Sequence, residues 1–141
     1  MVDERLGDGV RIAQLLASEI EGNEGRLRDL TVSDADPDVE PTADGALAYA
    51  VRRTEDGPGS DAGHADAPVA EVYVQPDRAR VEFVAAPDAA AEAAAERDLR
   101  VRPKAVRPPR TLVFVEDGAQ VKWILPVFER VLAAGGSGRD A

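Results

Sequence analysis

The chain has 141 residues, and its 27 acidic against 17 basic side chains give a formal net charge of −10. This length fits one domain with one modest core, and no apolar run reaches the roughly 18 residues of a membrane-spanning helix. The absence of cysteine excludes disulfides and thiolate chemistry. The N-terminal residues lack the basic-then-apolar order of a secretion signal, so we expect a cytoplasmic protein.

The residue types that carry the charges are more informative than the sign of the net charge. Only Lys104 and Lys122 are lysine, the other 15 cations are arginine, and aspartate outnumbers glutamate. Self-repulsion among so many carboxylates is tolerable in molar salt, where the Debye length falls to about 3 Å. The composition therefore favours a halophilic protein, of haloarchaeal origin. An acidic protein from a GC-rich mesophilic genome is the alternative that composition leaves open.

A helix is predicted over residues 8–21. Its apolar positions recur at helical spacing, and they are Leu6, Val10, Ala13, Ala17 and Ile20. Asp8 is a suitable N-cap and Gly22 a suitable residue to end the helix. A weak strand signal follows at 26–32. A stronger one lies at 46–53, where alternation predicts Leu47, Tyr49 and Val51 on one face.

The next two strands, 69–75 and 78–85, are predicted to form a hairpin around a Pro76-Asp77 turn. This register pairs apolar residues on one face, namely Val74 with Ala79, Val72 with Val81 and Ala70 with Phe83. Tyr73 opposite Arg80 and Glu71 opposite Glu82 then fall on the other face. A slip of one residue would spoil this sorting, so the register is well specified.

Alanine and glutamate predict a middle helix over 86–99, with Asp88 and Arg97 placed as the helix dipole prefers. Residues 111–115 are apolar on both faces, which is typical of a central strand. We therefore expect Leu112 and Phe114 in the core together with Val72.

Residues 116–134 are compatible with two structures. Asp117-Gly118 between alternating residues predicts a hairpin that pairs Phe114 with Val121 and Leu112 with Trp123, followed by a short helix over 126–134. Alternatively, Asp117 caps one helix from 118 to 134. Pro126 favours the hairpin, because an interior proline costs a helix ~3 kcal/mol whereas proline is welcome at its first position.

Together these elements predict one α+β domain over 1–134. It has an N-terminal helix, a mostly antiparallel sheet of about five to six strands, an Ala-rich middle helix and a short amphipathic C-terminal helix. The loops 33–45 and 54–68 are acidic or Gly-rich and should be mobile, and the tail 135–141 should be disordered.

Few motifs point to chemistry. Asp34, Asp36 and Asp38 have the spacing that opens a calcium loop, but Val39 stands where glycine is needed and Gly45 where a bidentate glutamate is needed, so we expect no metal site. His64 is the only histidine, and its Gly-rich loop offers no positioning for acid–base catalysis. No nucleophile elbow, P-loop or dinucleotide fingerprint occurs. No cofactor is expected, and enzymatic activity is left open.

Residues 100–110, "RVRPKAVRPPR", hold five cations, three prolines and no acid. The candidate anion-binding residues are Arg102, Lys104, Arg107 and Arg110. Nucleic acid is not the expected partner, because phosphate contacts weaken steeply with salt and no aromatic residue is interleaved to stack on a base. A small anion held by bidentate arginines is compatible with salt. The favoured interpretation is a stiff connector whose arginines pair with the protein's own carboxylates.

The C-terminal segment is a candidate homodimer interface. Its apolar residues are Trp123, Val127, Phe128 and Val131. A chain with few aromatic residues leaves few large groups to cover both sides of this stripe, and exposed surface of that kind marks association. A monomer whose core takes the whole stripe is the alternative.

The segments "DGVRIAQLLASEIEG" and "RPPRTLVFVEDGAQVKWILPVFERVL" resemble a small conserved family of haloarchaeal proteins without an assigned function. The resemblance covers the chain apart from 54–68 and the tail. It implies a cytoplasmic halophilic protein and carries over no catalytic or binding residue. We expect a non-enzymatic binding or assembly domain, with protein partners or self-association. The alternative is a small anion-binding enzyme or regulator that uses residues 100–110.

Overall fold

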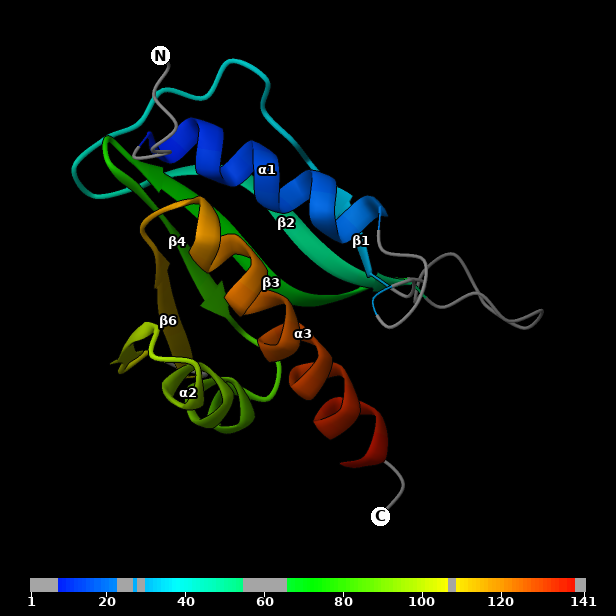
Figure 1. Cartoon of the computed structure of the whole chain (residues 1–141). Coiled ribbons are helices and arrows are strands. Elements are labelled where there is room, and N and C mark those ends of the chain that lie inside the picture. The colour runs from blue at the N-terminus through cyan, green and yellow to red at the C-terminus, as the bar shows by residue number, and fades with distance from the viewer. Residues whose placement is uncertain (1–7, 23–26, 28–29, 55–65, 107–108, 139–141) are drawn as a thin grey trace.

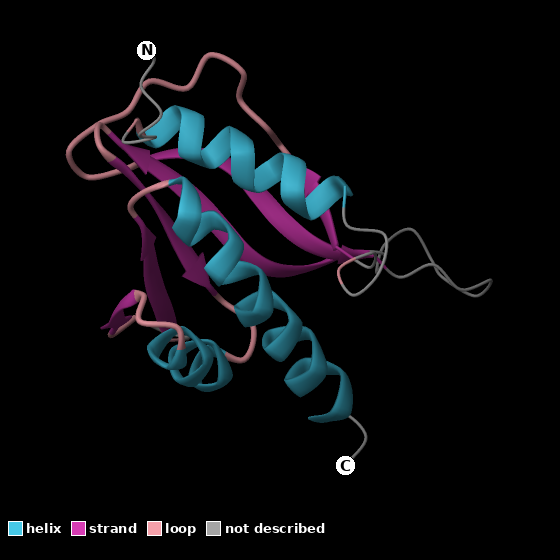
Figure 2. Cartoon of the chain, viewed as in Figure 1, coloured by secondary structure: helices cyan, strands magenta, loops and turns pink. Residues whose placement is uncertain are grey.

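The computed structural model describes residues 8–22, 27, 30–54, 66–106 and 109–138. Three helices and six strands occur in these ranges, which confirms the predicted α+β class (Figures 1 and 2). In chain order they are α1 (Gly9–Gly22), β1 (Leu30–Ser33), β2 (Ala46–Thr54), β3 (Asp66–Gln75), β4 (Arg78–Phe83), α2 (Pro87–Glu96), β5 (Arg100–Lys104), β6 (Arg110–Val115) and α3 (Gly118–Gly138).

The strands form one sheet in the order β1-β2-β3-β4-β6-β5, with every neighbouring pair antiparallel. The three helices pack on the same face of this sheet, as Figure 1 shows. Tyr49 of β2 donates a hydrogen bond to the Ala13 carbonyl of α1, and Thr111 of β6 donates one to the Pro87 carbonyl of α2. We call the opposite face, over which none of the described helices lies, the open face.

The N-terminal helix begins as predicted. Asp8 Oδ1 accepts hydrogen bonds from the backbone N–H groups of Val10 and Arg11, at 3.0 and 3.3 Å, which is the N-cap arrangement. The buried stripe differs in part from the predicted one and consists of Gly9, Ile12, Ala13, Leu16 and Ile20. Both stripes have helical spacing, and the observed one turns the larger Ile12 and Leu16 inward. Leu6 of the predicted stripe lies outside the described residues.

Gly9 sits where α1 meets the β3–β4 turn, and a side chain there would be costly. Its N–H donates to the Pro76 carbonyl at 3.3 Å, and a Cβ atom would overlap the backbone carbonyl oxygens of Gln75 and Arg78. We expect Gly9→Ala to lower the free energy of unfolding by ~1–3 kcal/mol, because helix or turn must move. Gly22→Ala is the matched control, since nothing lies within 4 Å of its added Cβ. Urea denaturation of both variants tests this, and equal stabilities would contradict it.

The predicted β3–β4 hairpin is confirmed with its register, including the pairs of Val72 with Val81 and Glu71 with Glu82. The prediction that Leu47 shares a face with Tyr49 and Val51, with the alanines of β2 on the other face, is wrong for Leu47 and Ala48. A β-bulge between Leu47 and Tyr49 places Ala48 and Tyr49 on the core side, and Leu47 opposite Tyr73 is 44% exposed. The extra residue of a bulge shifts the alternation of everything before it.

The predicted hairpin over 111–125 is wrong, and the single helix that had been the alternative is observed. Asp117 Oδ1 accepts from the Gln120 N–H at 3.0 Å, and Gln120 Oε1 accepts from the Glu116 N–H at 2.7 Å, so both side chains fix the start of α3. Pro126 lies inside the helix. Five apolar side chains of α3 are buried, namely Val121, Ile124, Val127, Phe128 and Val131. Each such burial contributes roughly 1.5–3 kcal/mol, which together exceeds the ~3 kcal/mol cost of the proline.

The end of α3 and the extent of α2 also differ from the prediction. The C-terminal helix runs to Gly138, past the predicted end at 134, whereas residues 139–141 lie outside the described ranges. The middle helix, α2, ends at Glu96 rather than at residue 99. Asp98 has a φ of 63° and turns the chain, which places Leu99 in the core ahead of β5.

The strand β6 pairs on both sides, with β4 and with β5, but only one of its faces is in the core. Thr111, Val113 and Val115 are buried, whereas Leu112 and Phe114 are half-buried on the open face. The expectation that Leu112 and Phe114 lie in the core is therefore wrong, and that for Val72 is confirmed. The helices cover one side of the sheet only.

In the described ranges, no helix has the length and apolar character needed to span a membrane.

Candidate functional site: the open face of the sheet

Alternation along four adjacent strands places charged and aromatic side chains together on the open face. They are Glu71 and Tyr73 of β3, Arg78, Arg80 and Glu82 of β4, Arg110 and Phe114 of β6, and Arg100, Arg102 and Lys104 of β5. The pairing aligns them in rows across the sheet. One row runs from Tyr73 through Arg80 and Phe114 to Arg100.

This face is basic in an acidic protein. With Arg52 of β2, the described strand side chains on the open face include seven cations and two carboxylates. Three carboxylates next to the strands, Asp34, Asp77 and Glu116, pair with these cations, so the face together with these partners carries a net charge of +2. Since the whole chain carries −10, all remaining residues together carry −12. The sheet therefore separates charge, with an excess of cations on the open face and of carboxylates elsewhere.

Glu82 is the centre of the charged cluster and is only 1% exposed. Its Oε2 atom accepts a hydrogen bond from Arg80 Nε at 2.9 Å. Its Oε1 atom lies 2.8 Å from Arg110 Nη1 and 3.3 Å from Lys104 Nζ. A buried carboxylate is stable only when paired and hydrogen-bonded, and here cations from β4, β5 and β6 meet that need. In turn, Glu82 fixes the positions of three cations.

Glu71, on the neighbouring strand, extends this cluster. It accepts hydrogen bonds from the Tyr73 hydroxyl at 2.7 Å and from Arg110 Nη1 at 3.0 Å. The hydrogen bond from Tyr73 is the main cause that lowers the pKa of the Glu71 carboxyl, and Arg110 adds to it against partial burial. Burial, followed by the hydrogen bond to Glu71, raises the pKa of the Tyr73 phenol. Arg110 thus bridges two carboxylates that face each other across the hairpin.

Arginine side chains also cover the aromatic rings of this face. The Arg80 guanidinium carbon lies 4.7 Å from the centre of the Tyr73 ring, and that of Arg78 lies 5.9 Å from the centre of the Phe114 ring. Both distances are within the range of cation–π attraction. At the sheet edge, Glu116 pairs with Arg78 at 3.5 Å and with Arg100 at 3.2 Å. Each ring thus lies beneath one arginine that is itself ion-paired.

The predicted anion-binding residues divide into three groups. Lys104 and Arg110 belong to the Glu82 cluster. Arg102 is exposed on β5 and makes no ion pair with another described residue. Arg107 lies outside the described residues. Residues 100–104 form an edge strand, where Pro103 is tolerated because an edge N–H need not be donated. The pairing of Lys104 and Arg110 with internal carboxylates agrees with the connector interpretation.

Most of the predicted interface residues lie inside the single chain. Three of them, Val127, Phe128 and Val131, are buried residues of α3 itself. The centre of the Phe128 ring lies 4.9 Å from the centre of the Phe83 ring. Trp123 is 41% exposed. The core thus takes most of the stripe, and Trp123 is the member that remains at the surface.

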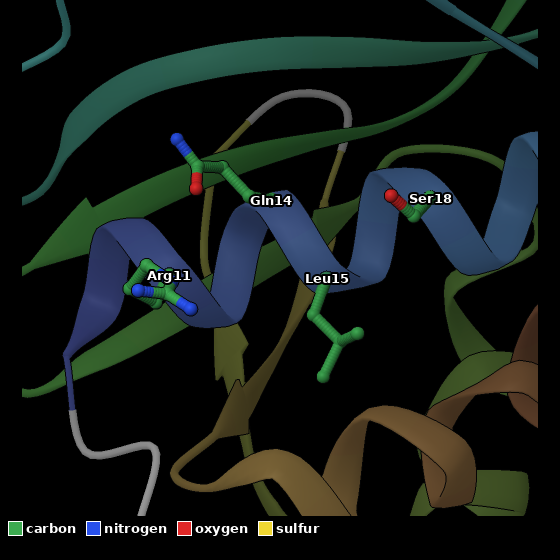
Figure 3. A pocket seen from close by; sticks show the side chains of 4 residues that line it. All are labelled: Arg11, Gln14, Leu15 and Ser18. Carbon is green, nitrogen blue, oxygen red and sulfur yellow. The ribbon is translucent and has the colours of Figure 1, made fainter. Parts of the chain in front are cut away.

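No candidate metal centre occurs in the described ranges. These ranges contain no group of three or more His, Asp or Glu residues that could hold a metal ion, and His64 lies outside them. A shallow hollow beside α1 is lined by Arg11, Gln14, Leu15 and Ser18 (Figure 3). Figure 3 shows these side chains spread along the helix, with no pair directed at a common point.

The Glu71–Glu82 pair was the signal in the sequence that could have located the open-face cluster. The predicted hairpin register already set these two carboxylates opposite each other, and like charges in that position destabilise a sheet unless cations separate them. The sequence did not show which cations these are, because Arg110 lies 28 residues from Glu82 and 39 from Glu71.

Comparison with protein-family models matches residues 1–141 to a "Family of unknown function (DUF7993)". No curated protein and no solved structure matches the chain. The match agrees with the predicted resemblance to a family without an assigned function, whereas a haloarchaeal source stays a prediction. Because the matching model spans residues 1–141, the chain belongs to the family of unknown function DUF7993.

Proposed function

We propose that this protein is a non-enzymatic binding domain of the cytoplasm, whose open sheet face binds an acidic surface of a partner protein. The observation that carries the proposal is the charge separation: the open face with its ion-pair partners carries a net +2 in a chain whose total is −10. Complementary charges that meet at an interface select partners, and such desolvated contacts are screened by salt much less than exposed charges are. An acidic partner fits this face, and the acidic remainder of the chain disfavours other orientations.

The geometry of the cations supports binding. Arginine and tyrosine are favoured at the centres of protein interfaces, because they combine apolar area with hydrogen-bonding groups. A flexible arginine loses side-chain entropy when it is immobilised on binding. Glu82 already orders Arg80 and Arg110 before a partner arrives. The face is thus preorganised, with Arg102 pointing outward as a further contact.

The alternative of a small anion-binding site at residues 100–110 has less support. Glu82 and Glu71 already pair with Lys104 and Arg110, so a bound anion would compete with two carboxylates already in place. A broad partner surface can instead use the outer cations and the aromatic rings without breaking these ion pairs.

Fluorescence anisotropy with a labelled glutamate-rich peptide tests the proposal. The variant Arg100→Ser/Arg102→Ser removes two cations that extend from the open face. The matched control Arg11→Ser/Arg97→Ser removes two exposed arginines from the helical side. We expect the first variant to weaken binding about fivefold or more, and the control to leave it nearly unchanged. Equal losses would refute a binding face, and a preference for a DNA oligonucleotide would replace the protein partner with nucleic acid.

Salt should stabilise the fold if the protein is halophilic, as we propose from its composition. Twenty-seven carboxylates repel one another in dilute buffer and are screened in concentrated salt. We expect the melting temperature to rise steadily between about 0.1 M and ~3 M KCl, a range over which the Debye length falls from ~10 Å to below 3 Å. Circular dichroism melts measure this. A constant midpoint over that range would rule out halophilic adaptation.

Self-association is a second binding mode that we propose, and the 41% exposure of Trp123 favours it. Tryptophan is a frequent interface anchor. In concentrated KCl, which screens repulsion between two acidic chains, light scattering should detect a dimer, and Trp123→Ala should return it to the 15.0 kDa mass of one chain. A single-chain mass for the unmodified protein at micromolar concentration would exclude the dimer.

A further inference from the structure

A cavity of about 280 Å³ lies on the helical side of the sheet, away from the open face. It is bounded by α1, by the strands β1 and β2, and by the segment 35–39 that follows β1. In Figure 1 the chain after β1 arches over α1 before it returns to β2. This volume is close to the lower limit of typical small-molecule sites.

The cavity is preformed because hydrogen bonds fix its outer wall. The N–H of Asp36 donates to the Ala48 carbonyl at 2.8 Å, and the N–H of Val39 donates to the Asp36 carbonyl at 3.2 Å. Asp36 Oδ1 also accepts from the Asp38 N–H at 2.9 Å. Binding of a ligand would therefore not require the conformational entropy cost of ordering this wall.

Most of the lining is apolar. It includes Val10 and Ala17 of α1, Val32 of β1, and Pro37 and Val39 of the outer wall. Tyr49 also lines the cavity, and its hydroxyl is already used in the hydrogen bond to the Ala13 carbonyl at 2.7 Å. The lining thus suits an apolar group about the size of one ring.

The charges of the lining are all negative. Glu21 of α1 and Asp36 of the outer wall contribute carboxylates, Gln14 contributes an amide, and no lysine or arginine occurs among the described lining residues. Burial, with a smaller contribution from the Glu21 charge, raises the pKa of the Tyr49 phenol, so the field of Glu21 extends to the tyrosine. A cation near this cavity is stabilised and an anion is repelled.

We infer that this cavity binds a small apolar amine in its ammonium form, with the apolar body between Val10, Val39 and Tyr49 and the ammonium group near Glu21 and Asp36. This site is separate from the open face. It requires no covalent chemistry, and its ligand is defined by one apolar ring-sized group and one positive charge.

Three probes of nearly equal shape test the site: phenethylamine, 2-phenylethanol and phenylacetate. Amide chemical shifts in ¹H–¹⁵N spectra should change at Val39, Ala48 and Tyr49 as each probe is added up to ~20 mM, a range suited to a millimolar dissociation constant. We expect the amine to bind about threefold tighter than the alcohol, as for a partly exposed charge pair, and the carboxylate to bind weakest. Equal binding of amine and carboxylate, or the absence of shifts at these residues, would overturn the proposal.

Variants distinguish the cavity from the rest of α1. Ala17→Leu adds three carbon atoms to the lining and should abolish the shifts, whereas Ser18→Leu adds a leucine to the exposed side of the same helix and should leave them. Glu21→Gln/Asp36→Asn keeps the shape and should remove the preference for the amine over the alcohol. If this double variant, which needs no repacking of the core, still prefers the amine, the carboxylates do not select the ligand and the proposal fails.

Discussion

Replacing Glu82 by glutamine should lower the free energy of unfolding by about 3–5 kcal/mol, the range observed when one partner of a buried ion pair is removed. Glu82 is 1% exposed and contacts Arg80, Lys104 and Arg110. The neutral amide keeps the size of the side chain but leaves three neighbouring cations without their common counter-charge. Urea denaturation at constant salt measures the loss, because guanidinium would itself screen the charges.

Glu116→Gln provides the control for this prediction. Glu116 also pairs with two arginines, but its side chain is 31% exposed, and exposed ion pairs contribute only about 0–1 kcal/mol. If both variants lose the same small amount, Glu82 is not an organising residue of the open face. If Glu82→Gln remains folded, it should also weaken binding of the acidic peptide, since Arg80 and Arg110 lose their fixed positions.

Truncating Phe128 to alanine should cost about 3–5 kcal/mol, as expected for a fully buried ring. Its side chain is 0% exposed and its ring packs 4.9 Å from that of Phe83. The loss has two sources, because the substitution removes buried apolar area and leaves a cavity between α3 and the sheet. Thermal or urea unfolding of the variant provides the measurement.

Phe114→Ala is the matched comparison, since it makes the same truncation on the open face. Phe114 is half-buried beneath Arg78, so we expect a loss of about 1–2 kcal/mol from the smaller area involved. Equal losses for the two phenylalanines would mean that the open face is covered in solution, for example by a second copy. A larger loss for Phe114 would contradict the two-layer arrangement.

Local sequence patterns determined several elements of this fold. The N-cap at Asp8 and the hairpin register around Pro76-Asp77 follow from contacts between residues near each other in sequence. The hairpin has only one register that sorts its apolar side chains onto one face. The same register already paired Glu71 with Glu82 on the opposite face, so the two carboxylates of the charged cluster were placed by local sequence.

The tertiary structure decided the elements for which local and long-range energies compete. For Pro126 the local preference is to begin a helix, but burial of the α3 stripe on the sheet outweighs the cost of an interior proline. Leu112 and Phe114 alternate with residues that are also apolar, so only the placement of the helices determines which set is covered. The bulge that exposes Leu47 likewise depends on pairing with β3.

The candidate site shows the same division. Composition alone established that the chain is acidic and that residues 100–110 are an exception. Which carboxylates those cations meet was decided by the strand order β3-β4-β6-β5, which brings Lys104 and Arg110 to Glu82 across 22 and 28 residues of sequence. Apolar residues recur at the spacing of a strand, so the sequence determined the strands of the hairpin. Charged residues have no periodicity that reveals a distant partner, so only the assembled sheet determined which of them form ion pairs.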